Sequence, residues 1–511
     1  MSHRTFASVV PALLLPFIAL HASAAGATPS DAAAAPATAA PDADKDEPDA
    51  PAAVPAAPVK VAKAVPEAAT TGPAPIAEPS PSATRMECKH ALISSDGWRI
   101  GACGYVALNA MHDSTQALGA GLNNAIIARP GTYAGDHDQM QFTAKDSRIN
   151  IEGSAPTMNG IDTSGLIQMD FTGVMPSDVT ENDSYIFGTP RLRLAVIKVK
   201  SPVVDLLFGQ YHDLFAWGGS GFFPATLGFL GVPGEVYHRQ PQARVSKTFH
   251  SDVADFEIAV AAVRPVQKAA GIPDGEAGLR LAFNQWTGAN TQGYGQPSIG
   301  PAAIGVSGIA RRFRLADFQA VPGDSTNGYG WGFAANVIIP VIPRSTNEDR
   351  SNGLTLTGEF TTGSGIADLY TGLTGGLLFP TLPNDPGTTP APLYTPNIDP
   401  GIVTYDGNGN LKTADWRAIV LGVQYYLPIA RGRVWLSGIY SQTRSANIVK
   451  LTPIPDRGTV FFKSEYEDAS LFAALTDALQ LSASFQTVHQ LFGDGAEARD
   501  NRIEFGAHFF F

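Results

Sequence analysis

The chain has 511 residues, of which 16% are charged, and its formal net charge is −12. This acidic balance argues against nucleic acid as a partner. No internal apolar run reaches the roughly 18 residues that a membrane-spanning helix needs. Amphipathic helices are nearly absent, and turn residues interrupt the chain roughly every 10–20 residues, which favours one large all-β unit over two or three mixed domains.

The N-terminal residues have the pattern of a secretory signal. A basic start precedes the apolar stretch Phe6–Leu20, and Ala22–Ala24 supplies the small residues of a cleavage site. No cysteine follows that site, which argues against a lipoprotein anchor. We therefore expect residues 1–24 to be a signal peptide and the remaining chain to be exported.

Residues 25–84 are a low-complexity segment rich in Ala and Pro with scattered acidic residues. They contain too few large apolar side chains to offset the entropy of ordering, and their prolines favour an extended coil. We expect a disordered tail in the periplasm. The alternative is a tether that contacts the cell wall.

The C-terminal stretch Asn501–Phe511 alternates between two kinds of side chain. Every second residue from Ile503 onward is apolar, whereas Arg502 and Glu504 lie on the other face of an extended strand. In a transmembrane barrel such an apolar face contacts lipid and the polar face lines a wet lumen. The aromatic residue at the end, Phe511, is typical of the signal that outer-membrane assembly machinery reads. The alternative is a soluble edge strand.

The same alternation recurs from residue 97 onward and predicts sixteen strands. In chain order these are about 97–109, Gln139–Glu152, Leu166–Met175, Pro190–Val199, Val203–His212, Gln242–Phe249, Val253–Val263, Gly278–Trp286, Ala302–Arg312, Tyr329–Ile339, Gly353–Thr361, Trp416–Leu427, Gly432–Thr443, Val460–Ala473, Leu479–Leu491 and the closing strand. The alternation breaks in the early half of Gln139–Glu152, which indicates a bulge. In Pro190–Val199 we expect Leu192, Leu194 and Val196 to share the outward face.

Short and long connections alternate between these strands. Turns such as Ser201-Pro202 are short, whereas other connections are long, and the longest is residues 362–415. Short periplasmic turns and long outer loops are expected of bacterial outer-membrane barrels. The predicted fold is therefore an all-β, transmembrane, antiparallel up-and-down barrel over residues 85–511, with both termini on the periplasmic side and loop 362–415 outside the cell.

A barrel of about sixteen strands leaves an aqueous channel instead of a packed interior. The connection between the fifth and sixth strands, residues 214–239, is large, apolar and rich in glycine. We expect it to fold into the barrel as a constriction loop; the alternative is an exposed loop that packs against a neighbouring subunit. Its key residues are Gly218, Gly219, Gly221, Phe222 and Phe223.

Selectivity of such a pore depends on the charges that line it. The face assignment points five arginines inward, against fewer inward acids, and guanidinium groups match carboxylates geometrically. This pattern favours anions. The alternative is that the arginines pair with the acids and only brace the wall. The predicted pore-lining residues are Arg148, Asp170, Arg191, Arg193, Arg244, Glu257 and Arg280, with Glu359 also inward.

The two cysteines, Cys88 and Cys103, lie close in sequence in an exported chain, so an intrachain disulfide is plausible. Free thiols are the alternative. Cys103 falls on the face that we expect to be luminal. A bond to Cys88 would then fold the preceding segment back against the barrel mouth.

Several short motifs, in this order, resemble those of the DcaP-like outer-membrane porins. The resemblance covers about residues 97–249, and beyond it only a general barrel pattern and the terminal phenylalanine are similar. The motifs are Gly104-Tyr105-Val106-Ala107-Leu108-Asn109, Ser147-Arg148, Ile167-Gln168-Met169-Asp170-Phe171, Arg191-Leu192-Arg193-Leu194-Ala195, Phe208-Gly209-Gln210 and Arg239-Gln240-Pro241-Gln242-Ala243-Arg244.

The resemblance implies a trimeric porin of sixteen strands whose basic lumen passes small anions such as dicarboxylates. Members of the family often carry an N-terminal coiled coil, but residues 25–84 are too rich in proline to sustain heptads. A trimer of this chain must therefore be held by the barrel wall. His212 and Asp213, which follow the motif Phe208-Gly209-Gln210, also depart from the small, hydroxyl-rich residues that the resemblance leads us to expect after this motif.

An enzyme and a structural barrel are the two other classes of function to consider. A hydrolase needs an oriented Ser/His pair, whereas most histidines here lie in predicted loops or termini, so we expect neither catalysis nor a cofactor. Residues 406–410 are similar to a calcium loop, but Leu411 replaces the turn glycine and Arg417 stands in place of the bidentate glutamate; we expect a polar turn and no metal. A structural or adhesive barrel with a closed lumen and an envelope-tethering tail remains the alternative to a pore.

Overall fold

The computed structural model describes residue 88 and residues 91–173, 188–227, 231–293, 295–317, 324–380 and 396–511. The expected signal peptide and tail, residues 1–84, lie outside the described residues. Among the residues that are described, no helix has both the length and the apolar character needed to cross a membrane.

Strands dominate the described chain. Those of the barrel wall are β2 (Trp98–Asp113), β3 (Gln139–Thr143), β4 (Arg148–Ser154), β5 (Asp162–Asp170), β6 (Arg191–Lys200), β7 (Asp205–His212), β8 (Arg239–Phe249), β9 (Ala254–Val263), β10 (Asp274–Asn290), β11 (Ser298–Ala316), β12 (Ser325–Ile342), β13 (Leu354–Ser364), β16 (Asp415–Tyr426), β17 (Val434–Ser445), β18 (Phe461–Ala474), β19 (Leu479–Phe492) and β20 (Glu497–Phe510). The remaining elements are short: β1 (Ala91–Ser95), β14 (Val403–Tyr405), β15 (Leu411–Thr413), α2 (Tyr133–Asp136), α4 (Ile448–Leu451), η2 (Phe215–Trp217), η3 (Lys268–Ala270), η4 (Ala367–Leu369) and η5 (Ile454–Thr459).

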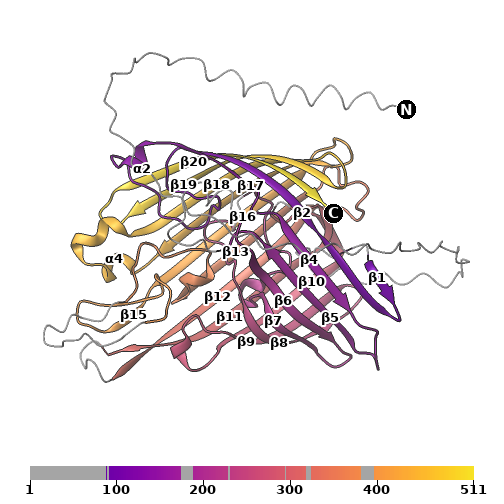
Figure 1. Cartoon of the computed structure of the whole chain (residues 1–511), viewed down its shortest axis with the longest axis horizontal. Coiled ribbons are helices and arrows are strands. Elements are labelled where there is room, and N and C mark those ends of the chain that lie inside the picture. Colours follow the sequence, from indigo (N-terminus) through magenta and orange to yellow (C-terminus); the bar gives the residue numbers. More distant parts are fainter. Residues whose placement is uncertain are drawn as a thin grey trace, which may run out of the picture. The chain divides into compact units, whose positions relative to one another are not determined.

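The wall strands form one closed antiparallel barrel (Figure 1). β2 pairs with β3 and β4, each wall strand from β4 onward pairs with the next, and β20 returns to pair with β2, so the described sheet closes on itself. Because β3 and β4 pair with β2 one after the other, they make a single wall strand, and the barrel has sixteen strands. The all-β class, the strand number and the up-and-down order predicted from the sequence are confirmed.

Several irregularities interrupt the regular pairing of the described strands, and two of them bear on the sequence predictions. Between β3 and β4, the four residues after Thr143 face the three residues of β2 that lie between Asn109 and Tyr105. This extra residue is the bulge that the sequence predicts. A second one, which was not predicted, lies in β6, where consecutive residues of β5, Gln168 and Met169, pair with Leu194 and Leu192.

The bulge in β6 corrects one face assignment. Leu192 is exposed on the outer face, but Leu194 and Val196 are buried. The three were expected to share the outward face, which requires an unbroken alternation of side chains along the strand. The residue inserted at Arg193 reverses the alternation, so Leu194 and Val196 leave the face of Leu192. The third predicted strand is also corrected, because β5 ends at Asp170.

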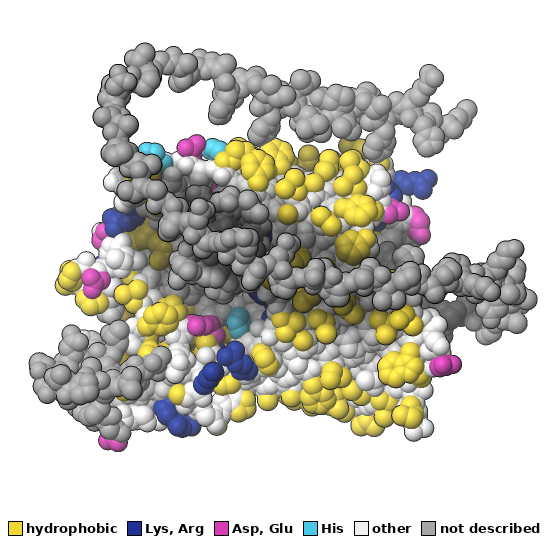
Figure 2. Space-filling view, viewed as in Figure 1, with side chains coloured by type: hydrophobic (Ala, Val, Ile, Leu, Met, Phe, Trp, Pro, Cys, Tyr) yellow, Lys and Arg dark blue, Asp and Glu magenta, His cyan; other side chains and the backbone are white. Residues whose placement is uncertain are grey.

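The outer face of the wall is apolar. Ile503, Phe505 and Phe509 of β20 are 44%, 39% and 50% exposed. Arg502 and Glu504, which lie between them in sequence, are 1% and 0% exposed. Hydrophobic side chains are spread over the strand surface visible in Figure 2. A closed barrel that turns apolar side chains outward is the transmembrane type, because it pairs every backbone group within the lipid.

The two ends of the barrel differ. At one end the connections are short, as at 201–204 and 475–478, and at the other they include 213–238 and 365–414. Bacterial outer-membrane barrels turn their long loops outward. The wall begins and ends at the short-turn end, where the backbone N–H of Gly104 donates to the carbonyl of Phe511 at 3.0 Å.

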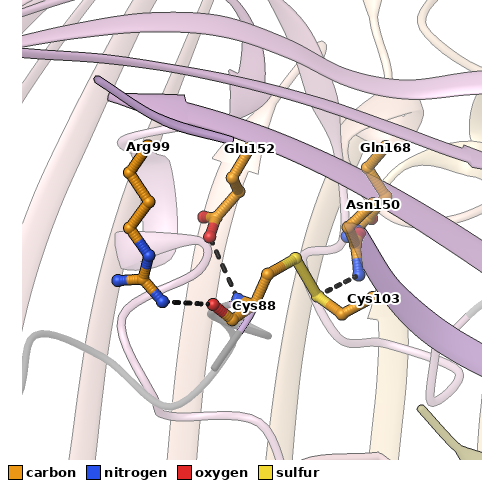
Figure 3. Close-up of a disulfide and its surroundings, with 6 residues drawn as sticks. All are labelled: Cys88, Arg99, Cys103, Asn150, Glu152 and Gln168. Carbon is orange, nitrogen blue, oxygen red and sulfur yellow. Dashed lines mark hydrogen bonds between the residues drawn. A yellow bond between two sulfur atoms is a disulfide. The ribbon is translucent and has the colours of Figure 1, made fainter. Parts of the chain in front are cut away.

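Cys88 and Cys103 form a disulfide whose Cα atoms lie 5.2 Å apart. Figure 3 shows how Cys88 is held: its N–H donates to Glu152 of β4, and its carbonyl accepts a 2.8 Å hydrogen bond from Arg99. Because Cys103 is buried on the inner face of β2, residue 88 is fixed against the inside of the wall. The short strand β1 pairs with the start of β2 just after it.

Replacing both cysteines by serine is expected to free the segment before β2 while the barrel stays folded. A bond across 15 residues contributes about 3 kcal/mol, which corresponds to amide exchange about 100-fold faster in β1. Hydrogen exchange of the purified barrel, followed by mass spectrometry, measures this, with the amides of β20 as the internal control. Equal exchange in β1 with and without the bond would contradict the expectation.

Candidate functional site in the barrel lumen

The lumen is crossed by the loop of residues 213–238, which joins β7 to β8 and is here called the lumen loop. Its first residues attach to the neighbouring inner wall. The backbone N–H groups of Leu214 and Phe215 both donate to Glu276 Oε2 of β10, at 2.8 and 3.0 Å. The N–H of Ala216 donates to Ser307 Oγ of β11 at 2.8 Å.

Trp217 lies against a seat made by two glycines. A Cβ on Gly305 would lie 2.6 Å from the Trp217 ring, and a Cβ on Gly278 would lie 3.0 Å from it. Only glycine at both positions therefore lets the indole approach the wall this closely. At that distance its Nε1 donates to the carbonyls of Leu279 and Val306, at 3.1 and 3.0 Å.

The residues after Trp217 turn sharply within the lumen. Gly219 and Gly221 have φ of +78° and +101°, values that side chains other than glycine rarely adopt. A Cβ on Gly218 would lie 2.8 Å from the carbonyl of Asp213. Phe222 then packs with Trp217 against the inner wall of β9–β12.

Phe223 belongs to a small aromatic group beside the wall of β7 and β8. Its ring lies 5.4 Å from Tyr237 in an edge-to-face arrangement, and both rings are near His212. The two ends of the lumen loop meet below this group, where His238 Nδ1 lies 2.8 Å from Asp213 Oδ2. Burial lowers the pKa of His238, but the Asp213 carboxylate outweighs it and the pKa is raised.

The later part of the lumen loop is fixed to the opposite wall. Thr226 Oγ1 donates to Asp468 of β18 at 2.7 Å, and the N–H of Val236 donates to Glu359 of β13 at 2.8 Å. Ser437 of β17 donates to the carbonyl of Ala225. The lumen loop thus spans the barrel from β10 and β11 to β13, β17 and β18, inside the wall.

Arginines gather where the lumen loop passes β5, β6 and β8. Asp170 accepts hydrogen bonds from Arg191 at 2.9 and 2.6 Å and from Arg193 at 2.6 Å. Arg193 is buried and also donates to the hydroxyl of Tyr237 at 2.6 Å. One carboxylate is therefore shared by two guanidinium groups, and one of these is covered by the loop.

Two further arginines complete this cluster without a direct ion pair among the described residues, and the buried carboxyl of Asp146 lies near Arg148. The guanidinium of Arg148 lies over the ring of Tyr105 at 5.2 Å, and that of Arg239 lies over Tyr237 at 5.3 Å. Neither arginine has an acidic side chain within 4.0 Å among the described residues, and Nε of Arg148 and Nη1 of Arg239 are buried there without a hydrogen-bond partner. We call Arg148, Arg191, Arg193 and Arg239 the basic cluster.

The pKa of Tyr237 reflects the excess positive charge of this cluster. Burial raises the pKa of a tyrosine, but Arg193, Arg239 and Arg148 outweigh that effect and bring the pKa of Tyr237 down to about 7. Burial, reinforced by Glu359, holds the pKa of Glu235 in the lumen loop well above its ordinary range. This shift favours the uncharged form of the Glu235 carboxyl.

The other predicted pore-lining residues also face inward. Arg280 of β10 lies 3.6 Å from Glu257 of β9, an ion pair within the wall. Arg244 donates to Gln242 and to the carbonyl of His212 and is almost fully buried. These three side chains brace the wall, whereas Arg148 of the predicted set lies unpaired at the basic cluster.

Arg239 was missed among the predicted luminal residues. Strict alternation from Gln242 and Arg244 assigns it to the outer face, but it is the first residue of β8. At a strand end the chain turns, and its side chain lies over Tyr237. The only sequence signal was its place in the motif Arg239–Arg244.

Two features of the long-loop end had no sequence signal. Arg311 of β11 pairs with Asp274 of β10 at 2.9 Å and with Asp368 of loop 365–414 at 2.5 Å. Around this bridge a buried apolar cluster joins the lumen loop to loop 365–414 and loop 114–138. Its members include Leu118, Leu122, Phe215, Val236, Phe313, Ile366, Leu369, Tyr370 and Trp416.

In loop 365–414, Asp406 accepts backbone hydrogen bonds from Asn408 and Asn410, which makes residues 406–410 a turn between β14 and β15.

The comparisons with known proteins agree with this architecture. No family model matches the sequence, and no curated protein matches it. The outer-membrane channel DcaP of Acinetobacter baumannii is similar in structure, with a TM-score of 0.58 and 16% identity over 82% of this chain and 99% of that one. The chain has a DcaP-like porin fold. The expectation drawn from the motifs is thus confirmed for the fold.

Other outer-membrane porins are more distant from this DcaP-like fold. An anion-selective porin from Comamonas acidovorans has a TM-score of 0.43 and 9% identity, over 81% of this chain and 100% of that one. OmpF of Salmonella typhi has a TM-score of 0.44 and 11% identity, over 82% and 99%. Scores this low say nothing further about the chain.

Replacing Trp217 by alanine is expected to release the lumen loop from its seat. Truncation of a buried aromatic side chain costs roughly 3–5 kcal/mol, here drawn from the local attachment of the loop. Limited proteolysis of the folded barrel in detergent should then cut within 213–238 at least 100-fold faster. Trp331→Ala, which removes an exposed indole from the outer face of β12, is the matched control and should leave the loop intact.

Proposed function

We propose that the protein is an outer-membrane porin that lets small hydrophilic solutes diffuse passively and favours anions, dicarboxylates among them. The observation that carries the proposal is the basic cluster, in which Arg148 and Arg239 have no acidic side chain within 4.0 Å among the described residues. Always-charged guanidinium groups in a narrow, partly desolvated passage attract anions and repel cations.

The distribution of charge across the lumen supports this preference. The basic cluster lies on β4–β8, whereas the inward acids Glu359 and Asp468 lie on β13 and β18. A solute that passes between them meets a field across the pore as well as along it. A small dianion with two separated carboxylates could contact more than one arginine of the cluster at once. This is the reason for including dicarboxylates.

The proposed setting follows from the wall. The apolar outer face and Phe511 support placement in the bacterial outer membrane, among phospholipid and lipopolysaccharide, after delivery by the barrel assembly machinery. We propose a homotrimer held by contacts of the barrel wall and a periplasmic N-terminal tail. The wall offers enough apolar surface for such contacts.

A closed barrel with a structural or adhesive role is the second candidate. The apolar cluster at the long-loop end favours it, because three loops pack there into a dry group inside the mouth. Single-channel recording in planar bilayers separates the two candidates. Steady ohmic steps support a pore, and silence from correctly folded protein supports the closed barrel.

Replacing Arg148 and Arg239 by serine is expected to lower the anion-to-cation permeability ratio about fivefold. Each lost unit charge lies roughly 8 Å from a passing ion in water-like surroundings. Its loss changes the energy of that ion by about 0.5 kcal/mol, which changes the permeability ratio about twofold. Reversal potentials in a salt gradient measure the ratio. The double variant Arg312→Ser/Arg314→Ser, which removes two arginines from the outer face of β11, is the control. An unchanged ratio in the luminal variant would refute the anion preference.

The anion preference is expected to weaken as pH rises through about 7. Tyr237, whose pKa is brought to about 7, then becomes a phenolate beside Arg193, Arg239 and Arg148, and each added negative charge lowers the permeability ratio about twofold. His238 loses its proton with rising pH and acts in the same direction. In Tyr237→Phe the change between pH 6 and pH 8 should be clearly smaller, as recorded by reversal potentials at both values.

A further inference from the structure

The outer face of β16–β18 carries a row of neighbouring cations at the long-loop end. Arg417 of β16, Arg444 of β17 and Lys463 of β18 are direct cross-strand neighbours, Arg417 opposite Arg444 and Arg444 opposite Lys463. Arg417 and Arg444 are exposed. Like charges placed directly opposite one another destabilise a sheet. A row of three cations on the outside of a membrane barrel therefore calls for an anion that binds them together.

The row just below these cations is mixed. Glu465 of β18 lies 2.8 Å from Lys463 and 3.7 Å from His489 of β19, and it accepts a hydrogen bond from Gln442. Lys463 therefore has one acidic partner. Arg417 and Arg444 have no acidic side chain within 4.0 Å in the part of the chain that the structure describes. The cationic character of the surface thus rests on these two arginines.

A groove opens in the wall below the polar rows. It has a volume of about 510 Å³ and is lined by Val423, Leu436, Gly438, Ala469, Ala483 and Phe485. An adjoining groove of about 640 Å³ continues it upward to Tyr440, Glu467 and Thr487. The small residues in the middle create the hollow, and the large apolar residues form its sides. In the hydrocarbon layer such a hollow is filled by an acyl chain or by protein.

We infer that this face binds a phosphorylated, multi-acyl glycolipid of the outer leaflet, with the chemistry of lipid A. Its phosphates lie against Arg417, Arg444 and Lys463, because anions of this kind match guanidinium groups. One of its acyl chains lies in the upper groove of about 640 Å³, whose lining includes Leu421 of β16, four residues along the strand from Arg417. Apolar contact below and cationic contact above are the two features that an anionic lipid requires of a protein surface. The inference concerns the outside of the wall and does not depend on the pore.

The choice of a lipid over a second copy of the chain rests on charge. A cyclic trimer would set this face against a different face of the next copy, and a wall that turns mostly apolar side chains outward offers few acids to neutralise the cations, whereas lipid phosphates do so. Free phosphate could satisfy the arginines but would leave the groove unoccupied. The test therefore separates these three occupants.

Binding is measured by native mass spectrometry of the folded full chain in detergent, titrated with bis-phosphorylated lipid A. In Arg417→Ser/Arg444→Ser the dissociation constant should rise about 30-fold, because each cation near the headgroup contributes about 1 kcal/mol. In Ala469→Phe, which fills the groove, it should rise about tenfold through the lost acyl contact. The control Arg312→Ser/Arg314→Ser, with two exterior cations removed from β11, should bind as the unmodified chain does.

Several outcomes would overturn the inference. One is equal binding by the Arg417/Arg444 variant and the unmodified chain, or an equal loss in the β11 control, since both mean a diffuse attraction to charge. Another is binding of inorganic pyrophosphate as tight as that of lipid A, which means a site for free anions. A third is a change of subunit number in the Arg417/Arg444 variant, which means a subunit contact. Channel recordings of the same variants report on the proposed porin function separately.

Discussion

The backbone pairing between β2 and β20 is the constraint on which the rest of the structure depends. In a lipid environment every unpaired N–H or C=O costs several kcal/mol, so a sheet can cross only if its first and last strands meet. Here they do, down to the reciprocal hydrogen bonds of Gly104 and Phe511. Closure at sixteen strands then sets an interior too wide for side chains of the wall to fill. The interior must be occupied by loops, solute or water.

The lumen loop occupies part of this wide interior. It is fixed at its start by Glu276 and Trp217 and on the far wall by Asp468 and Glu359, so it divides the interior instead of lining it. On the β13–β20 side loops and wall pack into an apolar cluster, and on the β4–β8 side the arginines collect. The asymmetry of the interior thus follows from where one loop is attached, and the proposed selectivity depends on that asymmetry.

Much of the fold could be predicted from alternation alone, because lipid outside and water inside impose period two on every strand. The strand number, the order and the bulge before Arg148 follow from it. The predictions were wrong where alternation breaks without a local signal, as at the inserted Arg193 in β6, or where a strand ends, as at Arg239. Alternation says which face a residue occupies but not what covers it. Hence the sharing of Asp170 by Arg191 and Arg193 and the loop over Arg193 could not be read from the sequence.

The seat of Trp217 limits how this protein can change over evolutionary time. The indole, Gly278 and Gly305 lie on three different segments, yet a side chain at either glycine collides with the ring at 3.0 Å or less. Alanine at Gly305 requires the indole to move or to be lost, alanine at Gly278 requires it to shift slightly, and the loss of the tryptophan relaxes the demand for both glycines. The three positions are therefore inherited as a unit, and a joint substitution pattern across them would mark the relatives that keep the same path through the barrel.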